Sequence, residues 1–316
     1  MKKYYYEERS KHERLIAEKF FGADGGNGTF KRKAYPFVLK DGENNLFGQI
    51  RDDVVRYFED NKIVWWGGTG GPSGHVLSSQ IACLNHLYYI RGNRDAVLAM
   101  VNGVRNIFRD VLPIGCDKES GYISFEVVSD NDYLGEDGPE RGANCTSIDA
   151  LVVALDESGR RWLIPIEWKY TESYTDNPSD DKSVGKKGEV RLERYFKLIR
   201  NSEQLKPLER YRGTVYFYEP FYQLMRQTLW AEQVIKHKER ERIMAEDYMH
   251  IHVVPQGNGD LREKKFRLSG EGMEQTWRNM IKDQSKYVVV DPSELMKPVN
   301  MIVPELTEYL RKRYWD

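Results

Sequence analysis

The sequence predicts an α/β protein with a single core and helical additions at both ends. The chain has 316 residues, which at roughly 150 residues per domain allows one elaborated domain or two modest ones. Between residues 76 and 254, segments with helical spacing of apolar residues are interleaved with apolar strand segments, an order typical of an α/β core. No internal repeat interrupts this order.

The composition indicates a folded protein from a reducing compartment. Hydrophobic residues make up 40% and charged residues 31%, and the 20 Tyr and 7 Trp are too many for a disordered chain. Cys83, Cys116 and Cys145 are odd in number and widely spaced, which excludes a full disulfide framework and a Cys-x-x-Cys motif. The N-terminus turns acidic at Glu7, and no stretch approaches the roughly 18 apolar residues of a membrane span. We therefore expect a soluble, cytoplasmic protein without a membrane partner.

Helices are predicted where apolar residues recur three and four positions apart. In chain order they span residues 8–20, 49–60, 76–90, 96–111, 189–199, 220–241, 273–282 and 304–313. Pro220 suits a first helical turn, because its missing amide would be unpaired there anyway. The glycine-rich segments 22–28 and 65–75 are predicted connectors, and the second lacks the Gly-Lys-Ser/Thr ending of a phosphate loop.

Strands are predicted in the apolar runs between turn signals. They span residues 122–128, 146–155, 161–170, 213–218, 248–254 and 287–290, and the polar segment 171–187 is a predicted loop. The strand 146–155 is apolar on both faces, which is typical of a strand in the middle of a covered sheet.

A tight turn joins the strands 146–155 and 161–170. If residues 157–159 form a three-residue loop with Gly159 in the left-handed conformation, Asp156 faces the residue after the loop, Arg160. The pairing of every other residue in the hairpin follows from this register.

The register gathers charged side chains at the open end of the hairpin. It places Asp149 opposite Glu167, and the pleat turns Lys169 to the same face. Two facing carboxylates, about 5 Å apart at Cβ, repel unless a cation joins them, and a divalent metal is the simplest such cation. Glu126 would add a third oxygen donor if its strand pairs alongside. The alternative is a structural ion pair with Lys169, but the apolar flanks favour a functional site, because burial costs several kcal/mol per ion.

The same residues resemble the signature of a nuclease superfamily. Residues 147–150 (SIDA) and 164–169 (IPIEWK) resemble the two halves of the PD-(D/E)xK signature, although its leading proline is absent. Residues 141–149 (RGANCTSID) and 222–227 (YQLMRQ) are similar to a group of bacterial restriction-endonuclease-like proteins. The resemblance covers about residues 75–255.

The resemblance implies a restriction-endonuclease-like core with a central mixed sheet flanked by helices, over residues 75–255. Residues 1–74 would form an N-terminal helical extension, and residues 256–316 a C-terminal extension packed on the core. It also implies Mg²⁺-dependent hydrolysis of phosphodiester bonds, with Mn²⁺ as a substitute and DNA as the expected substrate. RNA as substrate and a homodimer stay open.

By this resemblance, Asp149 and Glu167 would bind the metal. The Ile166 carbonyl would be a further ligand, beside the Glu126 carboxylate suggested by strand pairing, and hard oxygen donors of this kind suit Mg²⁺. Lys169 would orient the attacking water or steady the charge on the phosphate.

The predicted helix 220–241 holds a further candidate. Gln223 would take the catalytic role of the glutamine that approaches the active site in some related nucleases. The alternative is that Gln223 and Gln227, which share a helix face, lie on a solvated surface. Arg226 would contact either phosphate or water.

Charge is unevenly distributed along the chain. The net charge of −1 excludes a uniformly basic nucleic-acid coat. Residues 182–213 contain ten basic and four acidic residues, whereas residues 117–142 contain two basic and eight acidic ones. The basic segment either binds a phosphate backbone or forms a solvated helix surface. The rival to a nuclease is a non-catalytic nucleic-acid or protein-binding module on the same fold.

Overall fold

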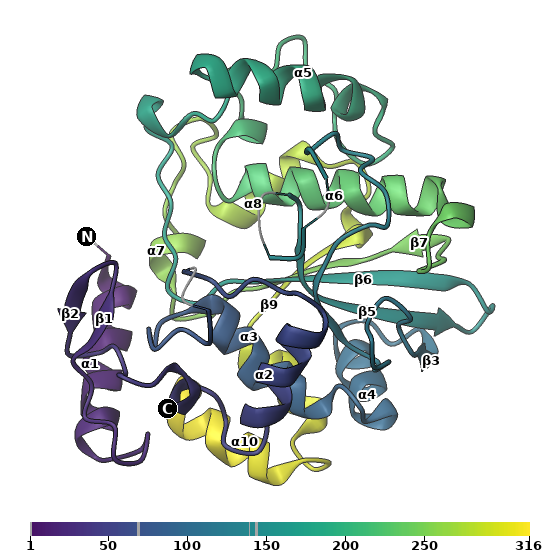
Figure 1. Ribbon diagram of the computed structural model, residues 1–316. Coiled ribbons are helices and arrows are strands. Elements are labelled where there is room, and N and C mark those ends of the chain that lie inside the picture. Colours follow the sequence, from purple (N-terminus) through teal and green to yellow (C-terminus); the bar gives the residue numbers. More distant parts are fainter. Residues whose placement is uncertain (1, 68–69, 139, 143–144) are drawn as a thin grey trace.

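The computed structural model describes residues 2–67, 70–138, 140–142 and 145–316. Its centre is a mixed seven-stranded sheet with helices on both faces (Figure 1), which confirms the predicted fold class. The main strand order is β3 (Phe108–Leu112), β5 (Ile148–Asp156), β6 (Arg161–Trp168), β8 (His250–Val253) and β9 (Tyr287–Val290). In addition, β4 (Ser124–Val127) pairs with β5, and β7 (Asp247–Tyr248) pairs with β6.

The sheet is mixed because its two halves are connected differently. β3, β4 and β6 all run antiparallel to β5, so short connections suffice there. β8 runs parallel to β6, and β9 runs parallel to β8. The crossover from β6 to β8 carries α5 (Gly185–Asn201) and α6 (Phe221–Lys236).

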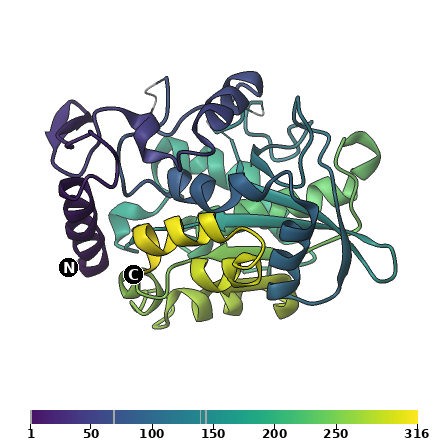
Figure 2. The same cartoon turned by 90° about the horizontal axis from the view of Figure 1, so that it is seen from below.

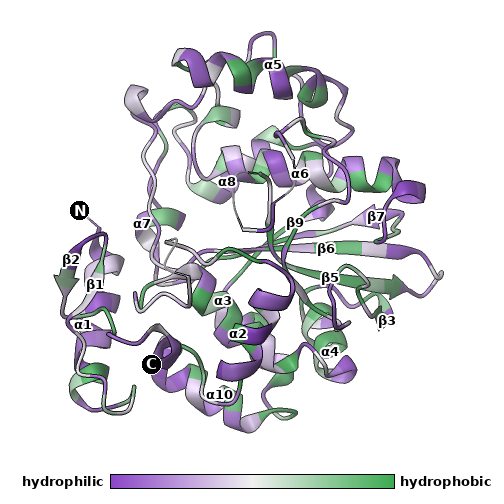
Figure 3. Ribbon diagram, viewed as in Figure 1, coloured by the Kyte–Doolittle hydropathy of each residue, from purple (hydrophilic) through white to green (hydrophobic). Residues whose placement is uncertain are grey.

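Each face of the sheet has its own hydrophobic core. Ala150, Val152 and Ala154 of β5 pack into the lower core of Figure 1. Leu151 and Val153 point into the upper core, so β5 is apolar on both sides and largely carries the hydrophobic colour in Figure 3. The prediction that this strand is covered on both faces is confirmed.

Helices complete the two layers. The upper layer contains α5, α6 and α8 (Met273–Met280). The lower layer, seen from below in Figure 2, contains α2 (Arg51–Asp60), α3 (Ser79–Leu87), α4 (Arg94–Val104), α9 (Pro292–Met296) and α10 (Pro304–Leu310). Short α7 (Gly259–Arg262) follows β8. No helix in the described ranges is long and apolar enough to span a membrane.

One flank of the molecule carries α1 (Lys3–Ala17) and a small hairpin, β1 (Gly28–Phe30) and β2 (Lys33–Tyr35) (Figure 1). Tyr4 and Ile16 of α1 are part of the lower core. The sequence pattern does not predict this hairpin, because its strands are only three residues long.

The predicted hairpin register is confirmed. Ala150 pairs with Ile166 and Leu155 with Arg161, as the three-residue loop requires. Gly159 adopts the left-handed conformation, with φ +84°.

Two predicted elements are wrong. The helix predicted over residues 96–111 ends at Val104, and β3 begins at Phe108. The Asn102 side chain bonds both the N–H and the carbonyl of Phe108, which turns the chain into the sheet. The strand predicted over residues 213–218 is a 3₁₀ turn at Val215–Phe217, closed by local bonds such as Phe217 N–H to the Thr214 carbonyl.

Candidate functional site

A cavity of about 350 Å³ lies at the end of the β5–β6 hairpin opposite its turn. In Figure 1 this is the left-hand end of the two strands, below α6. Its lining includes Glu126 of β4, Asp149 of β5, Glu167 of β6, Lys169 directly after β6, and Gln223 and Gln227 of α6. The structure therefore brings the predicted acids, the lysine and both glutamines into one cavity.

Glu167 and Lys169 form a buried ion pair. Lys169 Nζ lies 2.5 Å from Glu167 Oε1, and it donates a hydrogen bond of 2.7 Å to Gln223 Oε1. Gln227 Nε2 donates to Glu167 Oε2. Burial alone would lower the pKa of Lys169, but Glu167 and the other acidic groups around it together more than offset this, and the pKa lies well above its usual value.

The two glutamines do not form a solvated helix face. Gln227 is 1% exposed and Gln223 is half-buried. They lie one turn apart on α6, and each holds one partner of the ion pair.

Asp149 and Glu126 bring two further carboxylates to the cavity. Asp149 lies beside Glu167 in the confirmed register, and its Oδ2 accepts a 2.8 Å bond from the Trp168 N–H. Burial, followed by the charges of Glu167 and Glu126, raises the pKa of Asp149 well above its usual value. Burial also raises the pKa of Glu126. Three carboxyl groups from three adjacent strands therefore share the cavity, and two of them have raised pKa values.

Glu126 is positioned by an irregular strand. Its φ of +49° is a left-handed conformation that a non-glycine residue rarely adopts, and the regular pairing of β4 with β5 skips it. The register is the same on both sides of Glu126, so the irregularity is confined to the backbone of this one residue. Gln80 Nε2 and Ser147 Oγ each donate a 2.8 Å bond to the Glu126 carboxylate.

Arg141 holds the backbone on both sides of the Phe125–Glu126 peptide bond. Its guanidinium donates to the carbonyl oxygens of both Phe125 and Glu126, and it pairs with Asp117 at 3.0 Å. Tyr57 joins the same network, because its hydroxyl donates to Asp117 and accepts from the Phe125 N–H.

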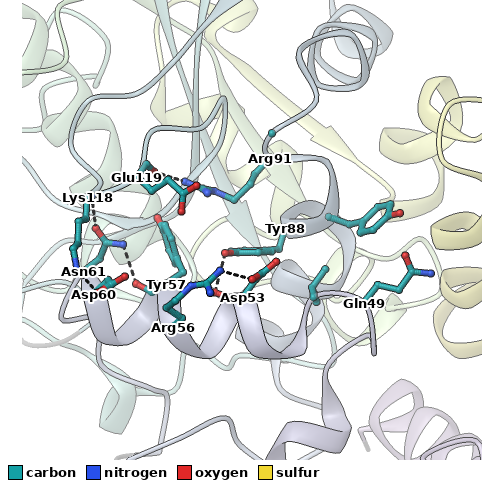
Figure 4. A pocket seen from close by; sticks show the side chains of 13 residues that line it. Gln49, Asp53, Arg56, Tyr57, Asp60, Asn61, Tyr88, Arg91, Lys118 and Glu119 are labelled. Atoms are coloured by element: carbon teal, nitrogen blue, oxygen red, sulfur yellow. Dashed lines mark hydrogen bonds and ion pairs between the residues drawn. The ribbon is translucent and has the colours of Figure 1, made fainter.

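Tyr57 also lines a second cavity of about 280 Å³ beside α2 (Figure 4). Arg91, which contacts Asp117 at 3.5 Å, lines it too. The network behind Glu126 therefore extends from the first cavity to the second.

The two segments RGANCTSID and YQLMRQ meet in space. Arg226 Nε donates to Thr146 Oγ1 at 2.9 Å and to Glu136 at 3.1 Å, so these partners of the arginine are protein groups. Gln227 Nε2 lies 3.4 Å from the Ser147 carbonyl. Ala143 and Asn144 of the first segment lie outside the described residues.

Ile166 is fully buried in β6, between β5 and β8, and its role as a carbonyl ligand stays a prediction. Gln80 is a residue of the site that the sequence pattern does not reveal. It lies on α3, 46 residues from Glu126, and the local signal is no more than one of several polar residues in this helix.

The three acids of the cavity are oxygen donors of the chemical kind that a hard divalent cation takes. Three carboxylates with oxygen donors share a cavity in which Lys169 already pairs with one of them, and burial followed by mutual repulsion raises the pKa of two of the three. Within the described ranges, no group of three or more His, Cys, Asp or Glu side chains is placed so that it could hold a metal ion. The cavity therefore offers suitable ligands without a complete coordination shell.

Comparison with known proteins agrees with the resemblance seen in the sequence. The family model REase-ARP, described as Restriction Endonuclease associating with ARP, matches residues 13–315. No curated protein and no solved structure matches the chain. Since the family match covers nearly the whole sequence, the chain belongs to this restriction-endonuclease family.

Proposed function

We propose that this protein is a metal-dependent nuclease that hydrolyses phosphodiester bonds in DNA, with Mg²⁺ as its cofactor and Mn²⁺ as a substitute. The observation that carries the proposal is the convergence of Glu126, Asp149 and Glu167 beside Lys169 in one cavity. Membership of a restriction-endonuclease family supports nuclease activity and favours DNA as the substrate.

Asp149 and Glu167 would hold the metal ion, with Glu126 and the Ile166 carbonyl as further oxygen ligands. A divalent cation bound there supplies Lewis acidity to the phosphate and offsets the charge of the acids. The Trp168 N–H fixes the orientation of the Asp149 carboxylate.

Lys169 would contact the scissile phosphate or the attacking water. Because its pKa is raised by Glu167, it is an ammonium group at neutral pH and acts as a hydrogen-bond donor rather than as a base. Gln223 fixes the direction of this ammonium through the 2.7 Å bond to Nζ. Gln227 does the same for the Glu167 carboxylate.

The test is plasmid cleavage by the purified protein with Mg²⁺, Mn²⁺ or EDTA. We expect cleavage only with metal, and a loss of about 100-fold or more in Asp149→Asn, Glu167→Gln and Lys169→Met. Glu157→Gln is the matched control, because this exposed acid lies in the turn of the same hairpin. Cleavage in EDTA, or equal cleavage by the three variants, would overturn the proposal. Metal-independent DNA binding without cleavage would favour the non-catalytic module.

A further inference from the structure

An exposed tryptophan stands at the rim of the site cavity. Trp66 is 44% exposed and lines the cavity together with Asp149 and Lys169. A single exposed apolar side chain is common on protein surfaces, so the position of Trp66 in the lining of this cavity is what matters. Its place beside the acids makes it a candidate for contact with whatever enters the cavity.

The ring of Trp66 is supported from behind. Phe30 stacks on it, with ring centroids 5.1 Å apart and planes 21° apart. His75 meets it edge-on at 5.7 Å. Two supporting rings hold the indole in place, so binding a flat ligand would cost little ordering of this side chain.

The backbone of Trp66 is tied to the acids. Its N–H donates a 3.0 Å bond to Gln80 Oε1, and Gln80 Nε2 donates a 2.8 Å bond to Glu126. A single side chain therefore sets the position of the aromatic ring relative to a proposed metal ligand.

Phe30 belongs to a hairpin with a strongly basic tip. Lys31 and Arg32 connect β1 to β2, with φ of +49° and +67°, and Lys33 follows them. Hairpin turns with two positive φ values favour Asn and Gly, so a Lys-Arg pair is not explained by the backbone. All three cations are exposed. This tip therefore presents positive charge next to the aromatic stack.

We propose that Trp66 stacks on an unpaired base of a DNA strand in the cavity, while Lys31, Arg32 and Lys33 contact the phosphates of that strand. The choice of DNA rests on the proposed function. Aromatic stacking tolerates any base, but within a regular duplex both faces of each base are already covered. The protein therefore prefers single-stranded DNA, or a base turned out of the helix, over a fully paired duplex.

The test measures binding in EDTA, so that it does not depend on cleavage. Fluorescence anisotropy compares one labelled oligonucleotide as a single strand and in a fully paired duplex. We expect tighter binding of the single strand, and Trp66→Ala should weaken that binding about 5- to 100-fold while leaving the duplex unchanged. Trp66→Phe should retain most of the affinity.

Controls separate stacking from a general loss of aromatic surface or charge. Tyr6→Ala removes an aromatic residue that is 52% exposed on α1, and it should leave binding unchanged. Arg32→Ser should reduce the slope of log affinity against log salt for the single strand by the amount that corresponds to about one phosphate contact. Circular dichroism checks that each variant is folded.

The inference is overturned if Trp66→Ala, correctly folded, binds the single strand as well as the parent does, or if the parent shows no preference for the single strand. Binding that depends on Trp66 in a protein that cleaves nothing would support this inference and refute the nuclease. Cleavage that needs Asp149, with binding indifferent to Trp66, would do the reverse.

Discussion

Glu167 and Lys169 are two oppositely charged side chains that the fold removes almost completely from water, at 0% and 5% exposure. Burying such a pair costs several kcal/mol per ion, and the mutual attraction repays this only if the remaining polar atoms are also bonded. The two α6 glutamines supply those bonds. Removing a single charge therefore leaves its partner buried without compensation.

We expect Lys169→Met to lower the free energy of unfolding by about 3–5 kcal/mol, because it leaves the Glu167 carboxylate unpaired in the protein interior. The double variant Glu167→Gln/Lys169→Met should recover most of this loss. Urea denaturation at neutral pH in EDTA, run as a double-mutant cycle, measures the coupling. Additive losses in the double variant would show that the two charges do not stabilise each other.

The residues of the site differ in how far the sequence could predict them. Asp149 and Glu167 could be predicted to face each other, because the three-residue loop that ends at Gly159 sets the register of the hairpin. This register then continues along both strands. The contacts of Gln80 and Arg141 with Glu126 join chain segments far apart in sequence. No local pattern encodes such contacts, so these two residues could not be predicted.

At the scale of elements, β4 is a strand with one irregular residue, Glu126, whose φ is +49°. Arg141 and Arg91 both contact Asp117 and both lie over the Tyr57 ring. Of the two, Arg141 is the one that bonds the backbone carbonyl of Glu126 itself. The two arginines therefore form a matched pair for testing the role of the left-handed backbone at Glu126.

We expect Arg141→Gln to reduce DNA cleavage about 10-fold or more, because Glu126 loses the bonds that hold its left-handed backbone. Arg91→Gln is the matched control, and it should cost similar stability with a smaller loss of activity. Initial cleavage rates, read beside urea midpoints for both variants, separate the two effects. Equal losses of activity in the two variants would contradict a positioning role for Arg141.

α5 shows why a charge count along the sequence overstates a basic surface. Arg194 pairs with Asp137 of the acidic segment, and Lys182 pairs with Glu219. Lys186 and Lys187 at the start of α5 are exposed. Part of the positive charge of this segment is thus neutralised by acidic residues distant in sequence. The exposed lysines remain candidates for contacts with a phosphate backbone.

We expect Lys186→Ser/Lys187→Ser to lower the slope of log affinity against log salt for duplex DNA by about 0.9 for each phosphate that the variant no longer binds. Arg311→Ser/Lys312→Ser removes two exposed cations beyond α10, on the opposite face of the sheet, and it should leave the slope unchanged. Anisotropy titrations at several salt concentrations give both slopes. An unchanged slope in the α5 variant would assign α5 to the solvated surface.

At the scale of the whole molecule, two cores on opposite faces of one sheet bury polar groups as well as apolar ones. The α/β class and the central hairpin were predictable, because apolar periodicity and turn residues are local signals. β3 could not be predicted, because α4 and β3 together read as one apolar pattern in the sequence. The side-chain bonds from Asn102 to the backbone of Phe108 end the helix and start the strand. The burial of individual histidines could not be predicted from the sequence either, because it depends on how the helices pack on the sheet.

Three of these histidines, His12 of α1, His86 of α3 and His250 of β8, are buried, and burial lowers the pKa of each to about 3. They are neutral in the folded protein, whereas in the unfolded chain they take up protons below about pH 6.5. Their contribution to stability is therefore fully present above that pH and is lost as the pH falls towards 3.

We expect each of these histidines to lower the free energy of unfolding on acidification from about pH 6.5 to pH 5, by up to about 1.4 kcal/mol per pH unit. His250→Gln should reduce the slope of unfolding free energy against pH by the contribution of one histidine. His250 is suited to this test because burial is the cause of its lowered pKa. Urea denaturation at several pH values measures both slopes. At about pH 8 the histidines are neutral in both states, so parent and variant should show the same pH dependence there. Equal slopes in the acidic window as well would mean that His250 is protonated without unfolding, and that water reaches its buried position in the sheet before the protein melts.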